Sequence, residues 1–281
     1  MKLFSFLFLA SLLLFSALGS QTPQESPELA EAISLTEEVV NLFNKGKFDD
    51  ALPRAKRALE IRERLLPHTD PRVSTSLSYL GDLYLAKRNY KAATPVFERL
   101  LQIQTERLGP DDVSAATTVD RLAVLYSCEG SPLKAEEMYK RALTLREKAF
   151  GVDDLRVAPA VYALAEFYRG EKQYELSAAH YKRALAINGR LAGIKDPEFE
   201  RASDGLTCLS YESKSPSLMK DLNEIRKQFA PPTAAPATVE RYVLDGKALK
   251  LPKPKFPLAA WQRRLSAHAV GPEGAWLSVE R

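Results

Sequence analysis

The sequence predicts an all-α protein built from about five antiparallel helix pairs. Motifs return every 42 residues, apolar residues recur with helical spacing inside each repeat, and a short polar turn divides each repeat in two. With 281 residues, 45% of them hydrophobic and 27% charged, the chain has the composition of a globular protein. Its formal net charge of +4 is too small to indicate a nucleic acid as partner.

The repeat is clearest in four aspartates and in the apolar residues that share their register. Each column is spaced by 42 residues: Asp70, Asp112, Asp154 and Asp196; Leu80, Leu122, Leu164 and Leu206; Tyr84, Tyr126 and Tyr168. Chance would not align this many columns, so the region is a tandem array.

Each repeat is expected to form two helices, for example over residues 70–87 and 90–107. Leu77, Leu80 and Tyr84 recur at helical spacing in the first of these, which places them on one face. The periodic aspartates are predicted to cap the first helices, because a carboxylate accepts hydrogen bonds from the free N–H groups of a first turn. They are not predicted to be catalytic.

The N-terminal residues are typical of an export signal. Lys2 precedes an apolar run of 16 residues, Leu3–Leu18, followed by small residues. As a helix this run would measure about 24 Å, which is shorter than a bilayer core of about 30 Å. We predict a cleaved signal peptide over residues 1–19, a flexible lead over 20–30, and location in a periplasm or outside the cell without stable membrane insertion. An uncleaved anchor is the alternative.

The repeat resembles the tetratricopeptide repeat. The residues that carry the resemblance are Leu80, Gly81, Tyr84, Ala93, Phe97 and Leu100, and the 42-residue period is similar to that of kinesin light chains. The resemblance implies a right-handed α-solenoid over residues 31–229, whose first helices line a concave groove that binds a peptide or helix of a partner protein.

The family's groove positions identify candidate binding residues. They are Ser78, Asp82, Asp120, Val124, Tyr162, Glu166, Arg169, Arg201, Asp204 and Tyr211. With Glu212 included, five acids face two bases at these positions, a net of about −3. We therefore predict a neutral or basic partner segment, with Tyr162 and Tyr211 as aromatic anchors. The alternative is that these charges only solvate a helix face.

The C-terminal part differs from the array. Residues 230–238 are rich in Pro and Ala and are predicted to be an extended linker. Residues 239–281 carry eight bases and four acids and form a basic tail. Residues 243–260 resemble the opening of a TonB C-terminal domain, so the tail is either an incomplete α+β element or disordered. This resemblance implies an alternative function, as a periplasmic accessory of TonB-type transport. The tail is also a candidate for contact with the chain's own groove.

The sequence contains no catalytic or metal-binding motif. Its three histidines do not lie at metal-ligand spacing from one another or from cysteines. The two cysteines fall two repeats apart, roughly 20 Å if packed helices lie about 10 Å apart, which is too far for a disulfide. We predict a non-enzymatic scaffold or adaptor that uses no cofactor, with both thiols free and at least half-buried.

Overall fold

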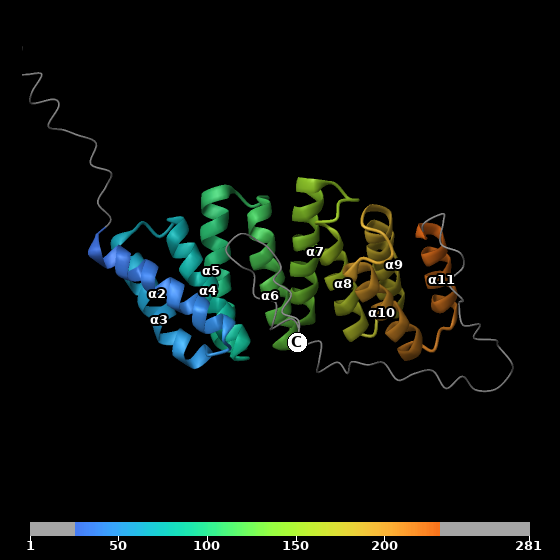
Figure 1. The fold of residues 1–281 in the computed structure, drawn as a ribbon, viewed down its shortest axis with the longest axis horizontal. Helices are drawn as coiled ribbons and strands as arrows, with labels where there is room; N and C mark the ends of the chain where they lie inside the picture. The colour runs from blue at the N-terminus through green and yellow to red at the C-terminus, as the bar shows by residue number, and fades with distance from the viewer. Residues whose placement is uncertain (1–25, 231–281) are drawn as a thin grey trace, which may run out of the picture. The chain divides into compact units, whose positions relative to one another are not determined.

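The computed structural model describes residues 26–230, and these residues form ten α-helices and one short 3-10 helix, with no strand among them (Figure 1). The predicted all-α fold of paired helices is confirmed. The predicted signal peptide, nearly all of the predicted linker and the predicted tail lie outside the described residues.

The helices divide into two units, residues 1–67 and 68–281. The first unit contains one pair, α2 (Pro27–Asn44) and α3 (Phe48–Leu65). The second unit contains four pairs: α4 (Pro71–Ala86) with α5 (Tyr90–Leu108), α6 (Ala116–Cys128) with α7 (Pro132–Phe150), α8 (Ala158–Gly170) with α9 (Tyr174–Leu191), and α10 (Pro197–Glu212) with α11 (Ser217–Phe229). The 3-10 helix η1 (Val113–Ala115) precedes α6.

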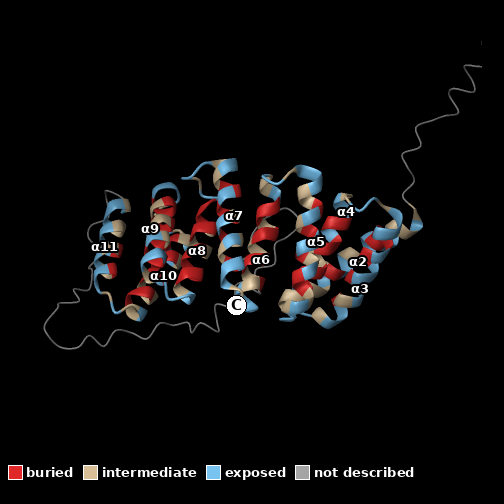
Figure 2. Cartoon of the chain, turned by 180° about the vertical axis from the view of Figure 1, so that it is seen from behind, coloured by how far each residue is buried: buried red, intermediate tan, exposed pale blue. Residues whose placement is uncertain are grey.

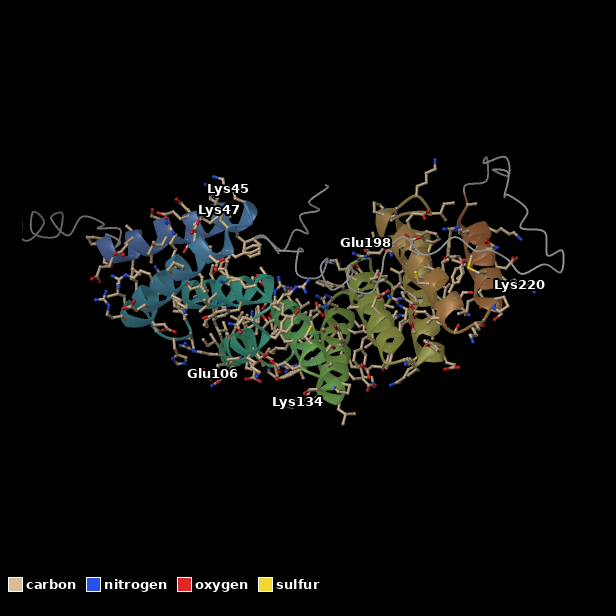
Figure 3. The ribbon with its side chains drawn as sticks, turned by 90° about the horizontal axis from the view of Figure 1, so that it is seen from below. Lys45, Lys47, Glu106, Lys134, Glu198 and Lys220 are labelled. Carbon is tan, nitrogen blue, oxygen red and sulfur yellow. The ribbon has the colours of Figure 1, made fainter. Side chains whose placement is uncertain are left out.

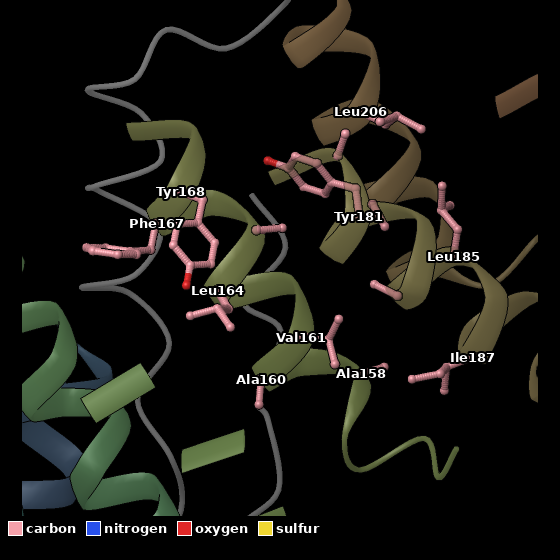
Figure 4. Packing of buried hydrophobic residues seen from close by; sticks show 14 of the residues in the cluster. Ala158, Ala160, Val161, Leu164, Phe167, Tyr168, Tyr181, Leu185, Ile187 and Leu206 are labelled. Carbon is pink, nitrogen blue, oxygen red and sulfur yellow. The ribbon is translucent and has the colours of Figure 1, made fainter. Parts of the chain in front are cut away.

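Within the second unit each pair packs on the next, because α5 contacts α6, α7 contacts α8 and α9 contacts α10. One helix pair cannot bury its apolar faces alone, so each pair covers an apolar face of its neighbour. The largest buried cluster spans α6 to α11 and includes Leu164, Tyr181 and Leu206 (Figure 4). Buried residues lie where the helices of this unit face each other, and exposed residues lie on their outer sides (Figure 2).

Glycine allows close helix contact at two points in this unit. A Cβ on Gly81 would lie 2.6 Å from Cζ of Phe97 in the paired helix α5. A Cβ on Gly205 would overlap the ring of Tyr181, which is fully buried in α9. The aromatic rings therefore occupy the space that a side chain would take on the facing helix.

The predicted aspartate caps are found at two first helices. The Asp70 carboxylate accepts a hydrogen bond from the backbone N–H of Arg72 at 2.8 Å, and Asp196 accepts from Glu198 at 2.9 Å. Each is followed by a proline at the first helical position, which starts the helix at once.

The other two aspartates do not cap α-helices directly, which corrects the prediction. Asp112 caps the 3-10 turn η1 through the N–H of Ser114, and α6 begins only at Ala116. Asp154 bonds the N–H of Arg156 at 2.9 Å, and α8 begins at Ala158. Neither aspartate is followed by a proline that would fix the first helical residue.

The first helix begins earlier than predicted. Residues 27–30, assigned above to a flexible lead, form the first turn of α2. The Ser26 side chain accepts from the N–H of Leu29 at 3.2 Å, and Pro27 follows it. This Ser-Pro cap was not recognised in the sequence, although it is the usual signal for a helix start.

The turn inside each pair follows the 42-residue period in all five pairs. One residue of each turn has a left-handed backbone: Gly46 (φ 69°), Arg88 (57°), Gly130 (72°), Lys172 (60°) and Lys214 (54°). Glycine adopts this conformation without strain, whereas arginine and lysine do not. The turn is therefore imposed by the packing of the two helices as well as by its own residues.

No helix within residues 26–230 is both long and apolar enough to cross a membrane. Cys128 and Cys208 are free thiols, as predicted. Cys208 is half-buried, but Cys128 lies exposed at the end of α6, which corrects its predicted burial.

Candidate partner-binding surface

The ten predicted binding residues lie on the first helices of the second unit. We call them together the first-helix face: Ser78 and Asp82 on α4, Asp120 and Val124 on α6, Tyr162, Glu166 and Arg169 on α8, and Arg201, Asp204 and Tyr211 on α10. Figure 3 shows the side chains of these helices and marks Glu198 in the first turn of α10.

These residues differ widely in how much surface they offer to a partner. Asp204 is exposed, whereas Asp82 and Glu166 are only 9% and 4% exposed. The other seven are half-buried. Asp82 and Glu166 therefore shape the face from beneath instead of meeting a partner directly.

Asp82 forms an ion pair with the next first helix. Arg121 of α6 donates to both carboxylate oxygens of Asp82, with 3.4 Å between Nη2 and Oδ2. Both side chains are nearly buried, at 12% exposed for the arginine and 10% for the aspartate. The bond joins α4 to α6 with a two-pronged geometry that fixes both side chains.

Asp120 is paired in a similar way with a second helix. Arg146 of α7 donates to both carboxylate oxygens, at 3.3 Å from Nη1 to Oδ1, and also to the carbonyl of Ala142. The Arg146 side chain is 10% exposed. This bond holds α6 against its own partner helix.

Glu166 lies at the centre of a buried cluster that links α8, α9 and α10. Its carboxylate accepts a hydrogen bond from the hydroxyl of Tyr181 and one of 2.6 Å from Nη2 of Arg169. Nη1 of Arg169 reaches Glu212 of α10, 2.8 Å away. Only 1% of the Glu166 side chain is exposed, so these partners take the place of water around its carboxylate.

The two tyrosines around Glu166 stay protonated. Burial, followed by the nearby Glu166 charge, raises the pKa of Tyr162 far above its usual value. The same two causes raise the pKa of Tyr181. Both phenols therefore remain neutral hydrogen-bond donors at any physiological pH.

Tyr162 does not present an open ring to a partner, contrary to its predicted role as an anchor. The guanidinium carbon of Arg201 lies 4.6 Å from its ring centroid, and the Tyr181 ring lies 5.8 Å away at 63°. Arg201 also pairs with Glu198 in the first turn of α10. A partner would meet the Arg201 guanidinium before the tyrosine beneath it.

Ion pairs reduce the net negative charge of the first-helix face, from which the charge of the partner segment was predicted. The sequence count set five acids against Arg169 and Arg201, but Arg121 and Arg146 also lie at this face and neutralise two of those acids. The net negative charge is accordingly smaller than the sequence indicated. Asp204 and Glu212 are the predicted acids that stay exposed at the surface.

Three functional neighbours were missing from the predicted set: Arg121, Arg146 and Tyr181. Two of the bonds cross 39 and 43 residues of sequence, close to the 42-residue period. Residues one period apart lie on neighbouring first helices, so opposite charges at that spacing were a usable signal.

The side chains of this surface are paired charges and apolar groups. Among residues 26–230, no three His, Cys, Asp or Glu side chains lie close enough to hold a metal ion. Except for Asp204, the charged groups of the face form ion pairs, and Val124 and Tyr211 are half-buried. Such a surface can bind a protein segment through apolar contact and a few directed polar bonds.

Comparison with known families identifies the repeat. Tetratricopeptide-repeat models match residues 31–106, 72–148 and 158–190, which together make up more than half of the chain. No curated protein matches the sequence significantly.

Solved structures share the fold. A kinesin light chain protein with nearly identical TPR-like repeats, from Podosopora anserina, has a TM-score of 0.60 at 17% identity, over 71% of this chain and 97% of that chain. BtubC (BKLC) from P. vanneervenii has a TM-score of 0.59 at 20% identity, over 82% and 99% of the two chains. The matched repeats and the packed helix pairs agree: this chain belongs to the tetratricopeptide repeat family.

Proposed function

We propose that the protein is a non-enzymatic scaffold that binds a peptide or helix of a protein partner along the first-helix face. The observation that carries the proposal is the placement of these ten residues on four successive first helices, α4, α6, α8 and α10. Tetratricopeptide repeats generally bind protein partners, and the matched models indicate no catalytic family.

The partner segment is neutral or basic and contributes apolar side chains. The acids of the face are largely neutralised by Arg121, Arg146 and Arg169, so a strongly charged segment gains little from them. Asp204 is exposed and favours a cation at the C-terminal end of the face. Val124 and Tyr211 supply apolar contacts, and Tyr211 takes the anchor role that the covered Tyr162 does not fill.

A peptide array with the intact protein tests the partner class. We expect neutral and basic peptides with apolar residues to bind better than acidic ones. Val124→Asp and Tyr211→Ala should each weaken binding by about tenfold, the loss of one good contact. Thr144→Asp, at an exposed position of α7, is the matched control and should leave binding unchanged. Preferential binding of acidic peptides, or equal losses in all three variants, would refute the proposal.

We also propose that the protein is exported. The basic residue, apolar run and small residues of positions 1–19 support this. Mass spectrometry of protein purified from the separated cell compartments should find a mature N-terminus at Ser20 outside the cytosol. An intact Met1 in cytosolic protein would contradict export.

A further inference from the structure

The last pair of the array exposes a helix face that the preceding pairs cover. Ala158 of α8, Ala116 of α6 and Ser74 of α4 precede Glu200 by one, two and three repeat periods. All three are buried. Glu200 itself is exposed on α10. Among the described helices no further pair follows α10 and α11, and Arg226 of α11 is the group that pairs with Glu200.

This face is acidic. The helix α10 carries Glu198, Glu200, Asp204 and Glu212 against Arg201. Arg201 pairs with Glu198, Arg226 of α11 with Glu200 and Arg169 of α8 with Glu212, so four acids meet three arginines and the exposed Asp204 keeps the net charge negative. At about 100° per residue, Glu200, Asp204, Cys208 and Tyr211 share one side of the helix. We call these four residues the end face. The acids on and beside it are partly exposed, with Glu200 at 54% and Glu212 at 44%.

The chain leaves the array beside the end face. Helix α11 runs antiparallel to α10, and Nη2 of Arg226 in its last turn lies 3.4 Å from Oε2 of Glu200. The following 51 residues, from position 231 on, therefore start within one helix width of the acids.

These 51 residues contain a segment of opposite charge. Residues 247–255 read KALKLPKPK, with four lysines and no acid. Sixteen residues separate this segment from Ala230, a random-coil reach of roughly 20–24 Å, which matches the length of about 24 Å for a 16-residue helix. The tether is thus long enough to place the lysines along α10.

We propose that residues 247–255 bind the end face of the same chain. The four lysines lie against Glu200, Asp204 and Glu212, and the apolar residues between them cover Tyr211. The contact is intramolecular and electrostatic, so it weakens with salt. The end face shares Asp204 and Tyr211 with the first-helix face, so the bound tail would compete with a partner segment at these two residues.

Alkylation of Cys208 measures the contact directly. The experiment uses the full chain with the substitution Cys128→Ala, which leaves Cys208, on the end face, as the single thiol. The tether should give the tail an effective concentration of a few millimolar at the end face. A contact with a Kd of about 1 mM would then be formed most of the time and should slow alkylation of Cys208 roughly threefold. Deletion of residues 239–281, or high salt, should remove this protection.

Charge variants sharpen the test. Replacing the four lysines with glutamate, or making Glu200→Lys with Asp204→Lys, should each restore fast alkylation. Combining both sets should bring the protection back, which a merely unfolded end face would not do. In the control protein, Cys208→Ala, the thiol of Cys128 on α6 should react at the same rate with and without the tail.

Three results would overturn the inference. They are equal Cys208 rates in full-length and truncated protein, protection that persists in high salt, and protection that rises with protein concentration, which would indicate a tail from a second copy. Alkylation is measured without peptide, and peptide binding can be measured on protein that lacks residues 239–281, so either proposal can fail while the other holds.

Discussion

The last helix pair and the pair before it have the same backbone plan but different cores. Val161 of α8 is completely buried among apolar side chains, and Ser203 occupies the same column in α10, equally buried, with no hydrogen-bond partner for its hydroxyl. Tyr168 of α8 packs in the core, whereas the same column in α10 holds Ser210. The comparison shows that the same fold tolerates a weaker core in the last described pair, which packs against α8 and α9.

The largest expected effect concerns the charged bond that joins the two pairs. Arg169→Met removes the cation that Glu166 needs while keeping most of the side-chain volume. Breaking such a buried pair costs about 3 kcal/mol, so the urea midpoint of unfolding should fall clearly. Lys227→Met is the control, because the exposed pair of Lys227 with Glu224 should contribute nothing measurable. Equal stability of the two variants would show that the ion pairs of Arg169 do not hold the last helix pair in place.

The next effect concerns the packing between the pairs. Gly205→Ala forces a methyl group into the buried Tyr181 ring, and overpacking of this kind costs about 1–3 kcal/mol. Gly170→Ala, at a helical position with no atom within 4 Å of the added Cβ, should be neutral or slightly stabilising. Thermal unfolding of both variants measures the difference. A stable Gly205→Ala protein would mean that Tyr181 has room to move.

A stabilising change is expected where the core of the last pair is weakest. Ser203→Val restores the residue type of the corresponding positions Leu77, Val119 and Val161, and removes a buried hydroxyl without a partner. The gain should be about 1 kcal/mol, seen as slower hydrogen exchange in α10 and α11. Ser213→Val is the control, since its half-buried hydroxyl already bonds the carbonyl of Leu209 at 2.7 Å. A loss of stability in Ser203→Val would show that this site excludes valine.

The same comparison explains what the sequence could predict. The period predicted about five helix pairs and located the turns of the first four, because stacking imposes the same contacts on each repeat. The charged pairs were missed because a helix-by-helix reading counts Asp82 and Asp120 as surface acids, while their arginines arrive from other helices. Burial of Tyr162 under Arg201 was missed for the same reason: it is set by the adjacent pair, not by the helix that carries the tyrosine.

A smaller effect is expected in the turns. Lys172, in the turn before α9, has a left-handed backbone where the preceding pair has Gly130. Lys172→Gly should stabilise the protein by about 0.5–1 kcal/mol, because it relieves this strain at some cost in unfolded-state entropy. Gly130→Lys should lose a similar amount. If both variants are neutral to urea unfolding, the turns carry no strain and the difference between the pairs lies wholly in their cores.

The smallest effect is a pH dependence of stability that arises in the helix pair α8 and α9, against which the last pair packs. His180 of α9 stacks on Tyr168 at 5.5 Å, in a column that holds Val96 and Met138 in earlier pairs. Burial, followed by the charges of Arg183 and Lys140, lowers its pKa below the ordinary 6.5, and Glu147 opposes this shift. As the pH falls below about 6.5, the unfolded chain takes up the proton first, so stability decreases until the pH passes the folded-state pKa. His180→Phe keeps the ring stacked and cannot titrate, so its urea midpoint should change less between about pH 7.5 and pH 5.5. An unchanged slope would assign the pH dependence to other groups and leave the support of the last pair to packing and to the Arg169 bond.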